Sequence, residues 1–352
     1  MRSWKWGRYE VLVRGAEDYE AVEVPVYKSV GGPLFKTLLS SACRMDCRYC
    51  PFSRYCRVPR IAWPRGKLVR AFMAAHAMGL VGGLFLSSGL YADPERVSSD
   101  IVAVAGDVRR AGFRGYIALR LMPGTPRHLI REALSVADRV GLNLEAPTPS
   151  GFEEIAPSKG SWSLDILSPL LYAASIAGSP YRVSTQLVVG ASGESDRDHL
   201  LLASRLLEAG VGVIHYSPYT PIPGTPLASK RPATPLWRVR RLYEAEALMR
   251  DYGFKLDWIL DALDDEGMLP PGREPLKEVI ARLNPGWFPV NPAEAGWGEL
   301  VRVPGIGPRA ARAIIGLRES GRALGPRILE GLLGRKRWVK ARPYLDLGGA
   351  RT

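Results

Sequence analysis

Three cysteines lie close together in the first sixth of the chain, and their spacing is the strongest chemical signal in the sequence. Cys43, Cys47 and Cys50 follow the pattern C-x3-C-x2-C within LLSSACRMDCRYCPFSRYC, residues 38–56. Three thiolates this close cannot pair evenly as disulfides, and they converge readily on one metal centre. A 4Fe-4S cube normally takes four thiolates, so three ligands from one loop would leave one iron open to a small molecule.

A structural zinc site is the alternative interpretation of this loop. Zinc favours four thiolates, or three thiolates with one imidazole, and Cys56 or a histidine would then be the fourth ligand. Zinc motifs usually place two C-x2-C pairs well apart, however, and this sequence has no second pair. The loop therefore favours a cluster. Cys56 would then be a buried thiol, a hydrogen donor or a residue without a chemical role.

The cysteine pattern resembles that of the radical SAM enzymes, in which an aromatic residue also precedes the last cysteine; here it is Tyr49. The resemblance implies a 4Fe-4S cluster whose free iron is chelated by the amino and carboxylate groups of S-adenosylmethionine (SAM). One-electron reduction from an external donor would then generate a 5'-deoxyadenosyl radical. The ring of Tyr49 would lie at the cluster edge, against the bound nucleoside.

The elements around the loop alternate between strands and helices. The loop follows an apolar run, residues 33–39, that reads as a buried strand. Further strands are expected at residues 82–89, 116–121, 140–146, 183–190 and 211–216, with helices at residues 67–78, 100–111, 126–137 and 196–209. This alternation predicts an α/β fold with a parallel sheet, a partial (β/α)6 barrel of TIM type, with its chemistry at the carboxyl ends of the strands. Two shorter strands are expected before it, at residues 9–13 and 21–27.

Several expected strand ends resemble those of radical SAM barrels. The turn SSG occupies the place of the glycine-rich turn that receives the SAM amino group, although its usual acidic residue is absent. An acidic residue in GLNLEAP would meet the ribose or the methionyl amine, and QLVVGASGES would lie near adenine. Arg120 and Lys159 would either contact substrate or be surface charges. The cofactor-binding residues implied by the resemblance are Tyr49, Ser87, Ser88, Gly89, Glu145, Gln186, Gly190 and Glu194.

The end of the chain reads as a second functional region. ELVRVPGIGPRAARAIIGL, residues 299–317, resembles a helix-hairpin-helix motif, in which a Gly-apolar-Gly turn joins two helices and approaches a phosphate. The nucleic-acid-binding residues expected there are Gly305, Ile306, Gly307, Arg309 and Arg312. Contacts of this kind hold the backbone without reading its sequence. An ordinary helical hairpin with a solvated basic face is the alternative.

Composition supports a polyanionic partner. The net charge is +13. Residues 301–352 hold twelve Lys or Arg against three Asp or Glu, so nine of the thirteen net charges lie there. The expected organisation is an N-terminal extension (1–30), a barrel (31–265), a linker (266–292) and an all-α helix-hairpin-helix domain (293–347). The absence of a signal-like or membrane-spanning segment predicts a cytoplasmic protein, and the three Asn and one Gln in the chain suggest a thermophile.

Taken together, residues 34–344 resemble the putative DNA modification or repair radical SAM proteins, a family associated with a uracil-DNA glycosylase-like partner. The resemblance rests on LLSSACRMDCRYC, GLFLSSGL, GYIALRLMPG, LNLEAPT with APSK, VVGASGESD, and FPVNPAEA leading into RVPGIG. It implies a radical that acts on DNA. Two alternatives stay open: a radical SAM enzyme that modifies tRNA, and a non-catalytic, zinc-stabilised DNA-binding protein.

Overall fold

The computed structural model describes residues 26–29 and 31–348. The strand expected at residues 9–13 and most of the one expected at 21–27 therefore lie outside the described residues. The chain forms two compact units. The first runs up to Glu194 and includes Arg205–Pro235, and the second comprises Ser195–Ser204 and the chain from Leu236 onward. The two are described separately below as the barrel and the helical unit.

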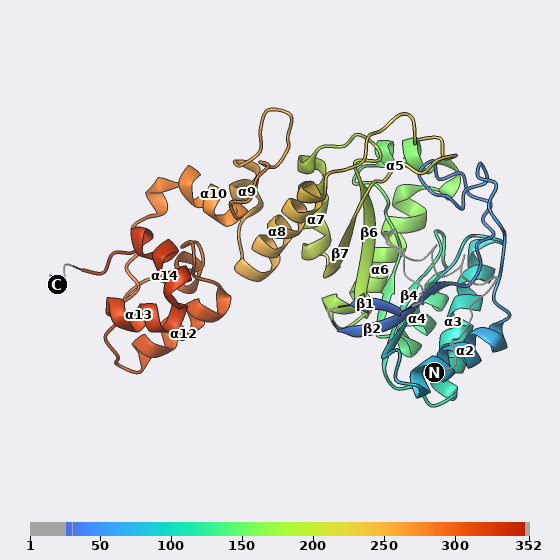
Figure 1. The fold of residues 1–352 in the computed structure, drawn as a ribbon, viewed down its shortest axis with the longest axis horizontal. Coiled ribbons are helices and arrows are strands. Elements are labelled where there is room, and N and C mark those ends of the chain that lie inside the picture. Colours follow the sequence, from blue (N-terminus) through green and yellow to red (C-terminus); the bar gives the residue numbers. More distant parts are fainter. Residues whose placement is uncertain (1–25, 30, 349–352) are drawn as a thin grey trace. The chain divides into compact units, whose positions relative to one another are not determined.

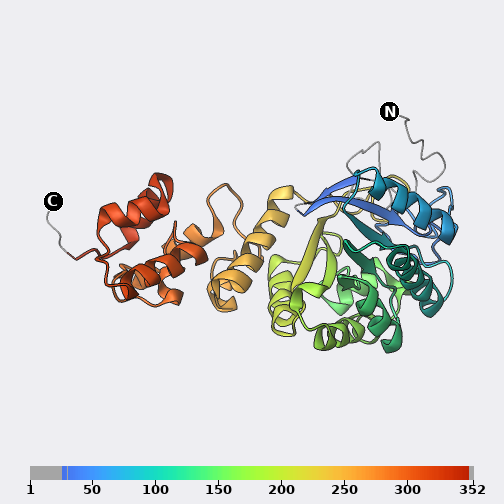
Figure 2. The ribbon, with the colours of Figure 1, turned by 90° about the horizontal axis from the view of Figure 1, so that it is seen from below.

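The barrel is built on one seven-stranded sheet whose strands lie side by side in the order of the sequence. Strand β1 pairs antiparallel with β2, and every later neighbour is parallel, so β2 to β7 form the expected six-stranded partial barrel. Its helices lie on the outer side of the curled sheet (Figures 1 and 2). The strands are β1 (Val26–Ser29), β2 (Gly32–Leu38), β3 (Gly83–Ser87), β4 (Tyr116–Arg120), β5 (Arg139–Gly141), β6 (Val183–Val189) and β7 (Val213–Pro218).

Two of the barrel helices, α3 (Pro94–Arg110) and α5 (Pro149–Ile155), begin at a side-chain cap, and α3 also shows an apolar buried face. In α3, the Asp93 side chain accepts a hydrogen bond from the Arg96 amide, and proline fills the first helical position. Its buried face includes Val97 and Ile101. The other helices are α2 (Arg65–Ala77), α4 (Arg127–Val136), α6 (Ser168–Ile176) and α7 (Asp196–Glu208), of which α7 runs across the division between the units.

Strand β5 is shorter than the sequence predicts. It ends at Gly141, whereas the apolar run predicts a strand to residue 146. The backbone of Glu145 has φ 64°, a left-handed conformation that a strand cannot accommodate. Beyond Gly141 the chain keeps only an isolated bridge between Glu145 and Leu187. The early end of β5 leaves Glu145 on an irregular segment at the carboxyl edge of the sheet.

The helical unit contains the C-terminal elements. They are α8 (Leu236–Tyr252), α9 (Leu256–Leu260), α10 (Leu276–Leu283), α11 (Trp297–Leu300), α12 (Pro308–Glu319), α13 (Pro326–Leu333) and α14 (Arg335–Ala341). The last four surround an apolar core that includes Leu300, Ile306 and Ile314. None of the helices in the described ranges combines the length and apolar character needed to cross a bilayer.

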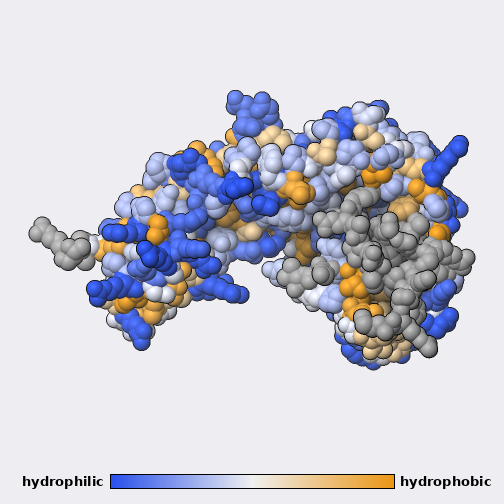
Figure 3. All heavy atoms as spheres, viewed as in Figure 1, coloured by the Kyte–Doolittle hydropathy of each residue, from blue (hydrophilic) through white to orange (hydrophobic). Residues whose placement is uncertain are grey.

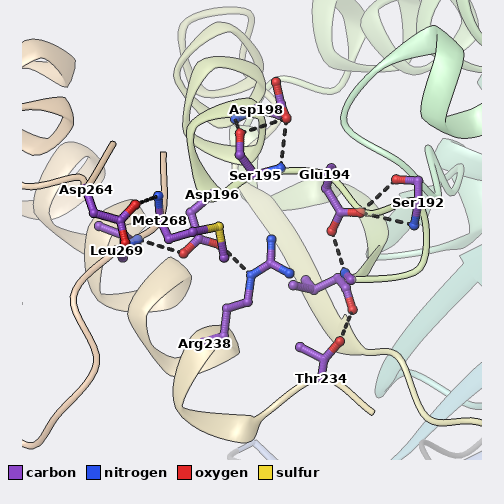
Figure 4. A network of polar contacts seen from close by, with 12 residues as sticks. Ser192, Glu194, Ser195, Asp196, Asp198, Thr234, Arg238, Asp264, Met268 and Leu269 are labelled. Carbon is purple, nitrogen blue, oxygen red and sulfur yellow. Dashed lines mark hydrogen bonds and ion pairs between the residues drawn. The ribbon is translucent and has the colours of Figure 1, made fainter. Parts of the chain in front are cut away.

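Helix α8 groups with the helical unit, although its residues fall within the range expected for the barrel, 31–265. Arg241 donates a hydrogen bond to the carbonyl of Pro270, and Glu244 accepts one from the Leu276 amide. Asp196, at the start of α7, joins this unit because it accepts hydrogen bonds from Arg238 and the Leu269 amide (Figure 4). The units therefore divide at Leu236. A functional domain boundary within 266–292 stays a prediction.

Candidate active site

A cavity of about 290 Å³ lies in the barrel, lined by residues from the carboxyl halves and ends of its strands. The three cysteines of the motif lie together at this cavity, beside the turn after β3 and residues of β6 and β7. Of the residues expected at the cofactor, those that line it are Tyr49, Ser87, Ser88, Gly89, Glu145 and Gln186. Residues more than a hundred positions apart in sequence thus meet at one surface.

Gly190 and Glu194 do not belong to that lining. The Glu194 carboxylate accepts hydrogen bonds from the Gly190 amide and from the amide and hydroxyl of Ser192, the latter two at 3.1 and 2.7 Å (Figure 4). Both residues therefore shape the turn after β6. A direct role in binding SAM remains a prediction for them.

An arginine outside the motif holds the cysteine loop together. The Arg60 guanidinium donates hydrogen bonds to four carbonyl groups of the loop, those of Ser41, Phe52, Ser53 and Cys56, at 2.9, 2.7, 2.8 and 2.9 Å. The backbone carbonyl groups of a loop without regular secondary structure need such partners to keep one shape. The motif spacing gives no sign of Arg60, so sequence reasoning missed it.

The loop is also attached to the segment that follows α5. The Asp46 amide donates to the Ser158 hydroxyl at 3.1 Å, and the Ser158 amide donates to the Asp46 carboxylate at 2.9 Å. The Arg48 amide donates to the Ile155 carbonyl at 2.7 Å. These bonds join positions more than a hundred residues apart, and they place the loop beside Lys159.

The turn after β3 touches the cysteine loop directly. A Cβ atom on Gly89 would lie 2.4 Å from the Ala42 carbonyl oxygen and 3.1 Å from the Cys43 Cβ. The Gly89 amide donates to the Ser40 carbonyl at 2.7 Å. Glycine at this position therefore lets the two backbones pack together. The sequence resemblance singles out Gly89 for cofactor binding, and the structure adds this contact.

A buried ion pair lies next to the cysteines. Glu145, whose side chain is 3% exposed, pairs with Lys159. Burial alone would lower the pKa of the Lys159 ammonium, but the Glu145 carboxylate raises it, so the lysine stays charged. The left-handed backbone of Glu145 aims this carboxylate at the cavity, a kind of strain that is concentrated at functional sites. Lys159 thus belongs to the site and is not a surface charge.

The environment of the thiols favours their neutral form in the metal-free protein. Burial raises the pKa of Cys47 and raises that of Cys50 to about 12. Burial, followed by the charge of Glu145, raises the pKa of Tyr49 as well. A bound metal centre would supply the positive charge that converts buried thiols to thiolates.

The cysteines fit an iron-sulfur cluster in their chemistry. All four cysteines are free, and Cys43, Cys47 and Cys50 line one cavity. Within the described residues, no group of three or more His, Cys, Asp and Glu side chains is arranged to hold a metal ion. A 4Fe-4S cube differs from a single ion because each thiolate binds a separate iron, which spreads the sulfur atoms apart. Cys56 lies outside the lining, with its thiol 3.4 Å from the Gly224 carbonyl.

In the helical unit, the residues of the expected hairpin form a turn between α11 and α12. Gly305 has φ +85°, and a Cβ there would lie 2.4 Å from the Arg337 carbonyl oxygen on α14. Ile306 is buried in the core, while Arg309 and Arg312 at the start of α12 are exposed. Pro308 is the first residue of α12. Figure 3 shows hydrophilic side chains projecting from the visible face of these C-terminal helices.

A lysine distant in sequence supports the hairpin. Lys277 of α10 donates from Nζ to the Ile306 carbonyl at 2.5 Å, and the same ammonium lies 5.0 Å from the centre of the Tyr252 ring. At Gly307, the second hairpin glycine, an added Cβ would lie 3.4 Å from the Tyr252 hydroxyl and would meet no closer atom. The hairpin pattern itself gives no hint of Lys277 or Tyr252.

No family model matches the chain, and no curated protein matches it. Among solved structures, the FeFe-hydrogenase maturase HydG from Carboxydothermus hydrogenoformans aligns with a TM-score of 0.50 and 17% identity, over 70% of this chain and 55% of that one. This chain therefore shares the fold of the maturase over the aligned part, a partial (β/α)6 barrel. It spans only a little over half of the maturase.

Two further structures align less well. A radical SAM methyltransferase from Sphaerobacter thermophilus gives a TM-score of 0.48 and 13% identity, over 63% of this chain and 65% of that one. The radical SAM enzyme coproporphyrinogen III oxidase (HemN) from Escherichia coli gives 0.37 and 14%, over 58% and 49%.

Proposed function

We propose that the chain is a radical SAM enzyme that holds a 4Fe-4S cluster through Cys43, Cys47 and Cys50 and cleaves SAM reductively. One observation carries the proposal: three free thiols with C-x3-C-x2-C spacing line a cavity at the strand ends of a partial (β/α)6 barrel. When bound, the cluster would supply the electron that an external donor delivers to SAM. The remaining chemistry belongs to binding and positioning by the chain.

The residues around the cysteines have separate tasks in this proposal. Arg60 and Ser158 fix the loop through its backbone and through Asp46. The Glu145–Lys159 pair offers one acceptor and one donor of opposite charge beside the thiols, which suits the ammonium and carboxylate ends of an amino acid. The buried walls limit the access of water, which protects a reactive radical from quenching.

Anaerobic reconstitution with iron and sulfide tests the cluster. The purified full-length chain should take up iron, turn brown, and release 5'-deoxyadenosine from SAM once reduced with dithionite. Stoichiometric zinc in protein purified under anaerobic conditions, without iron uptake or SAM cleavage on reconstitution, would instead support the zinc-stabilised alternative.

The proposed substrate is DNA. Support comes from the hairpin geometry, the exposed Arg309 and Arg312, and the excess of basic residues near the C-terminus. A base within a duplex is inaccessible to a radical in the barrel, so the reaction requires a flipped, damaged or terminal nucleotide. The uracil-DNA glycosylase-like partner implied by the sequence resemblance belongs to the same proposal. We also propose a cytoplasmic location and a thermophilic origin for the protein.

Competition binding separates DNA from RNA. Labelled duplex DNA containing a damaged site should bind more tightly than tRNA. Both are measured at the same salt concentration, because the affinity of phosphate contacts depends strongly on salt. Tighter binding of tRNA would favour the RNA-modifying alternative. Co-purification with a tagged glycosylase, compared with a variant truncated before residue 293, would test the partner.

A further inference from the structure

The inner part of the barrel cavity is basic. Lys36 of β2 and Arg120 of β4 line it, and their cationic groups lie 5.4 and 5.8 Å from the centre of the Phe85 ring. Among the described residues that line the cavity, Glu145 is the one acidic side chain, and it pairs with Lys159. The lining therefore contains three basic groups and one carboxylate.

Neighbouring strands of the barrel accommodate and fix the Arg120 guanidinium. Arg120 is 5% exposed, and its Nη1 donates hydrogen bonds to the Ser184 carbonyl at 3.1 Å and to the Ser184 hydroxyl at 2.6 Å. A Cβ on Gly141 would lie only 1.7 Å from Nη1. Glycine on β5 thus leaves the room that the guanidinium occupies. The group is fixed in place, as a preorganised binding group should be.

One further side chain points to a ligand in this cavity. Tyr219 is a lining residue that is only 2% exposed, and its buried hydroxyl has no hydrogen-bond partner among the described residues. A buried hydroxyl without a partner is unfavourable, and a bound acceptor would satisfy it. His215 of β7 lies outside the lining; its pKa is lowered to about 3, first by burial and then by the positive charges of Arg120, Arg139 and Lys36. The two lining cations, Arg120 and Lys36, thus act on this part of the barrel together.

We propose that Lys36 and Arg120 form an oxyanion subsite that binds a phosphate or carboxylate group of the substrate. A planar guanidinium and an ammonium make charge-assisted hydrogen bonds to such oxygens, and these bonds are strengthened where water is excluded. The charged end of the substrate then lies deep in the barrel, and the part that reacts lies nearer the cysteines. This subsite rests on the proposed function where the substrate is a nucleic acid. The group that it binds is then a terminal phosphate, because an internal phosphodiester is flanked by nucleotides on both sides. Of the flipped, damaged and terminal nucleotides that the proposed function allows, the subsite thus fits the terminal one.

Calorimetric titration of the full-length chain with sodium phosphate, and separately with sodium acetate, tests the subsite. At least one anion should bind to the parent protein, and Arg120→Gln and Lys36→Met should each weaken it about 10- to 100-fold. Arg131→Gln is the matched control, because Arg131 is an exposed arginine on α4 that donates to Tyr172. Equal affinity in all four proteins, or no binding to any, overturns the proposal.

Two additions keep the test decisive. Lys36 is only half-buried, so Lys36→Met reports on the subsite even if Arg120→Gln fails to fold, which circular dichroism would reveal. A 5'-phosphorylated oligonucleotide should outbind its 5'-hydroxyl counterpart, with the difference lost in Lys36→Met, if the oxyanion is a nucleic-acid end. Free anions that bind without this difference assign the subsite to a small molecule. Neither measurement needs iron or SAM, so failure here is distinct from failure of the proposed cluster.

Discussion

The cysteine loop and the C-terminal hairpin are both irregular segments that must keep one conformation, yet different interactions stabilise them. The loop is held by polar bonds, four from Arg60 and a reciprocal pair between Asp46 and Ser158. The hairpin is held largely by apolar burial, with Val303 and Ile306 in the core of the helical unit and one hydrogen bond from Lys277 to the Ile306 carbonyl. An irregular loop leaves many backbone groups without partners in a helix or sheet, so hydrogen bonds from side chains must satisfy them.

The comparison predicts that each turn can be broken without the other. Cys47→Ala should abolish iron uptake and SAM cleavage, because Cys47 lies in the cavity lining and is a proposed ligand. Duplex binding should stay unchanged in a gel-shift titration. Cys56→Ala is the matched control, since Cys56 lies outside the lining and should retain its cleavage activity. Retained cleavage in Cys47→Ala would contradict the ligand assignment.

The converse change is Gly305→Ala. An alanine there must adopt φ +85° and meets the Arg337 carbonyl at 2.4 Å, so the helical unit should lose about 2–4 kcal/mol of stability, and the proposed binding of DNA should weaken with it. Gly307→Ala meets only the Tyr252 hydroxyl at 3.4 Å and should cost less than about 1 kcal/mol. Urea denaturation of both variants measures this difference, and similar losses would refute the geometric argument.

The apolar setting of the hairpin also predicts a dependence on pH. Burial, opposed by Glu278, lowers the pKa of Lys277 to about 7, from 10.5 in the unfolded chain. Between these values the unfolded chain binds a proton that the folded chain lacks, so stability should rise with pH from about 7 to about 10. Lys277→Met should remove an effect on the order of 2–3 kcal/mol.

Urea denaturation at pH 7 and pH 9.5 measures this slope. Burial raises the pKa of Glu246 to about 7, which adds stability as pH falls below 7 and so affects a different pH range. An unchanged slope in Lys277→Met would assign the effect to another group.

A smaller effect is expected when a hydrogen-bond donor of the cysteine loop is removed. Arg60→Gln should raise hydrogen exchange at loop amides about tenfold and speed the loss of iron, because four carbonyl groups lose their shared donor. Exchange in the metal-free protein is measured first, so that the result does not depend on the cluster. Arg57→Gln, an exposed position three residues earlier, should leave exchange as it is.

The smallest expected effect concerns the exposed arginines of the hairpin. Arg309→Gln and Arg312→Gln should each reduce the salt dependence of duplex binding by about one unit in the log–log slope, with no change in stability. Arg327→Gln on α13 is an exposed arginine of the same unit and serves as the control. Equal slopes in all of these proteins would remove the two arginines from the proposed interface.

Local patterns in the sequence predict the strands, the cysteine site and the hairpin, because each pattern involves residues only a few positions apart. The six-stranded partial barrel is confirmed. The supports of the site could not be predicted in this way. Ser158 meets Asp46 across 112 positions, and Lys277 meets Ile306 across 29, so only the folded chain shows these contacts.

Strand β5 shows where local reasoning fails. Its apolar run continues to residue 146, but the strand ends at Gly141, and Glu145 adopts a left-handed backbone conformation and lines the cavity. Departures of this kind from a local pattern are typical of functional sites.

The pairing of Arg120 with Gly141 limits how this protein can be engineered. The cation occupies the volume that a side chain on the neighbouring strand would otherwise fill. An attempt to graft this arginine onto another barrel would fail unless the recipient also lost its side chain at the adjoining position. The two residues form one transplantable unit, and library designs that vary either alone should recover few folded clones.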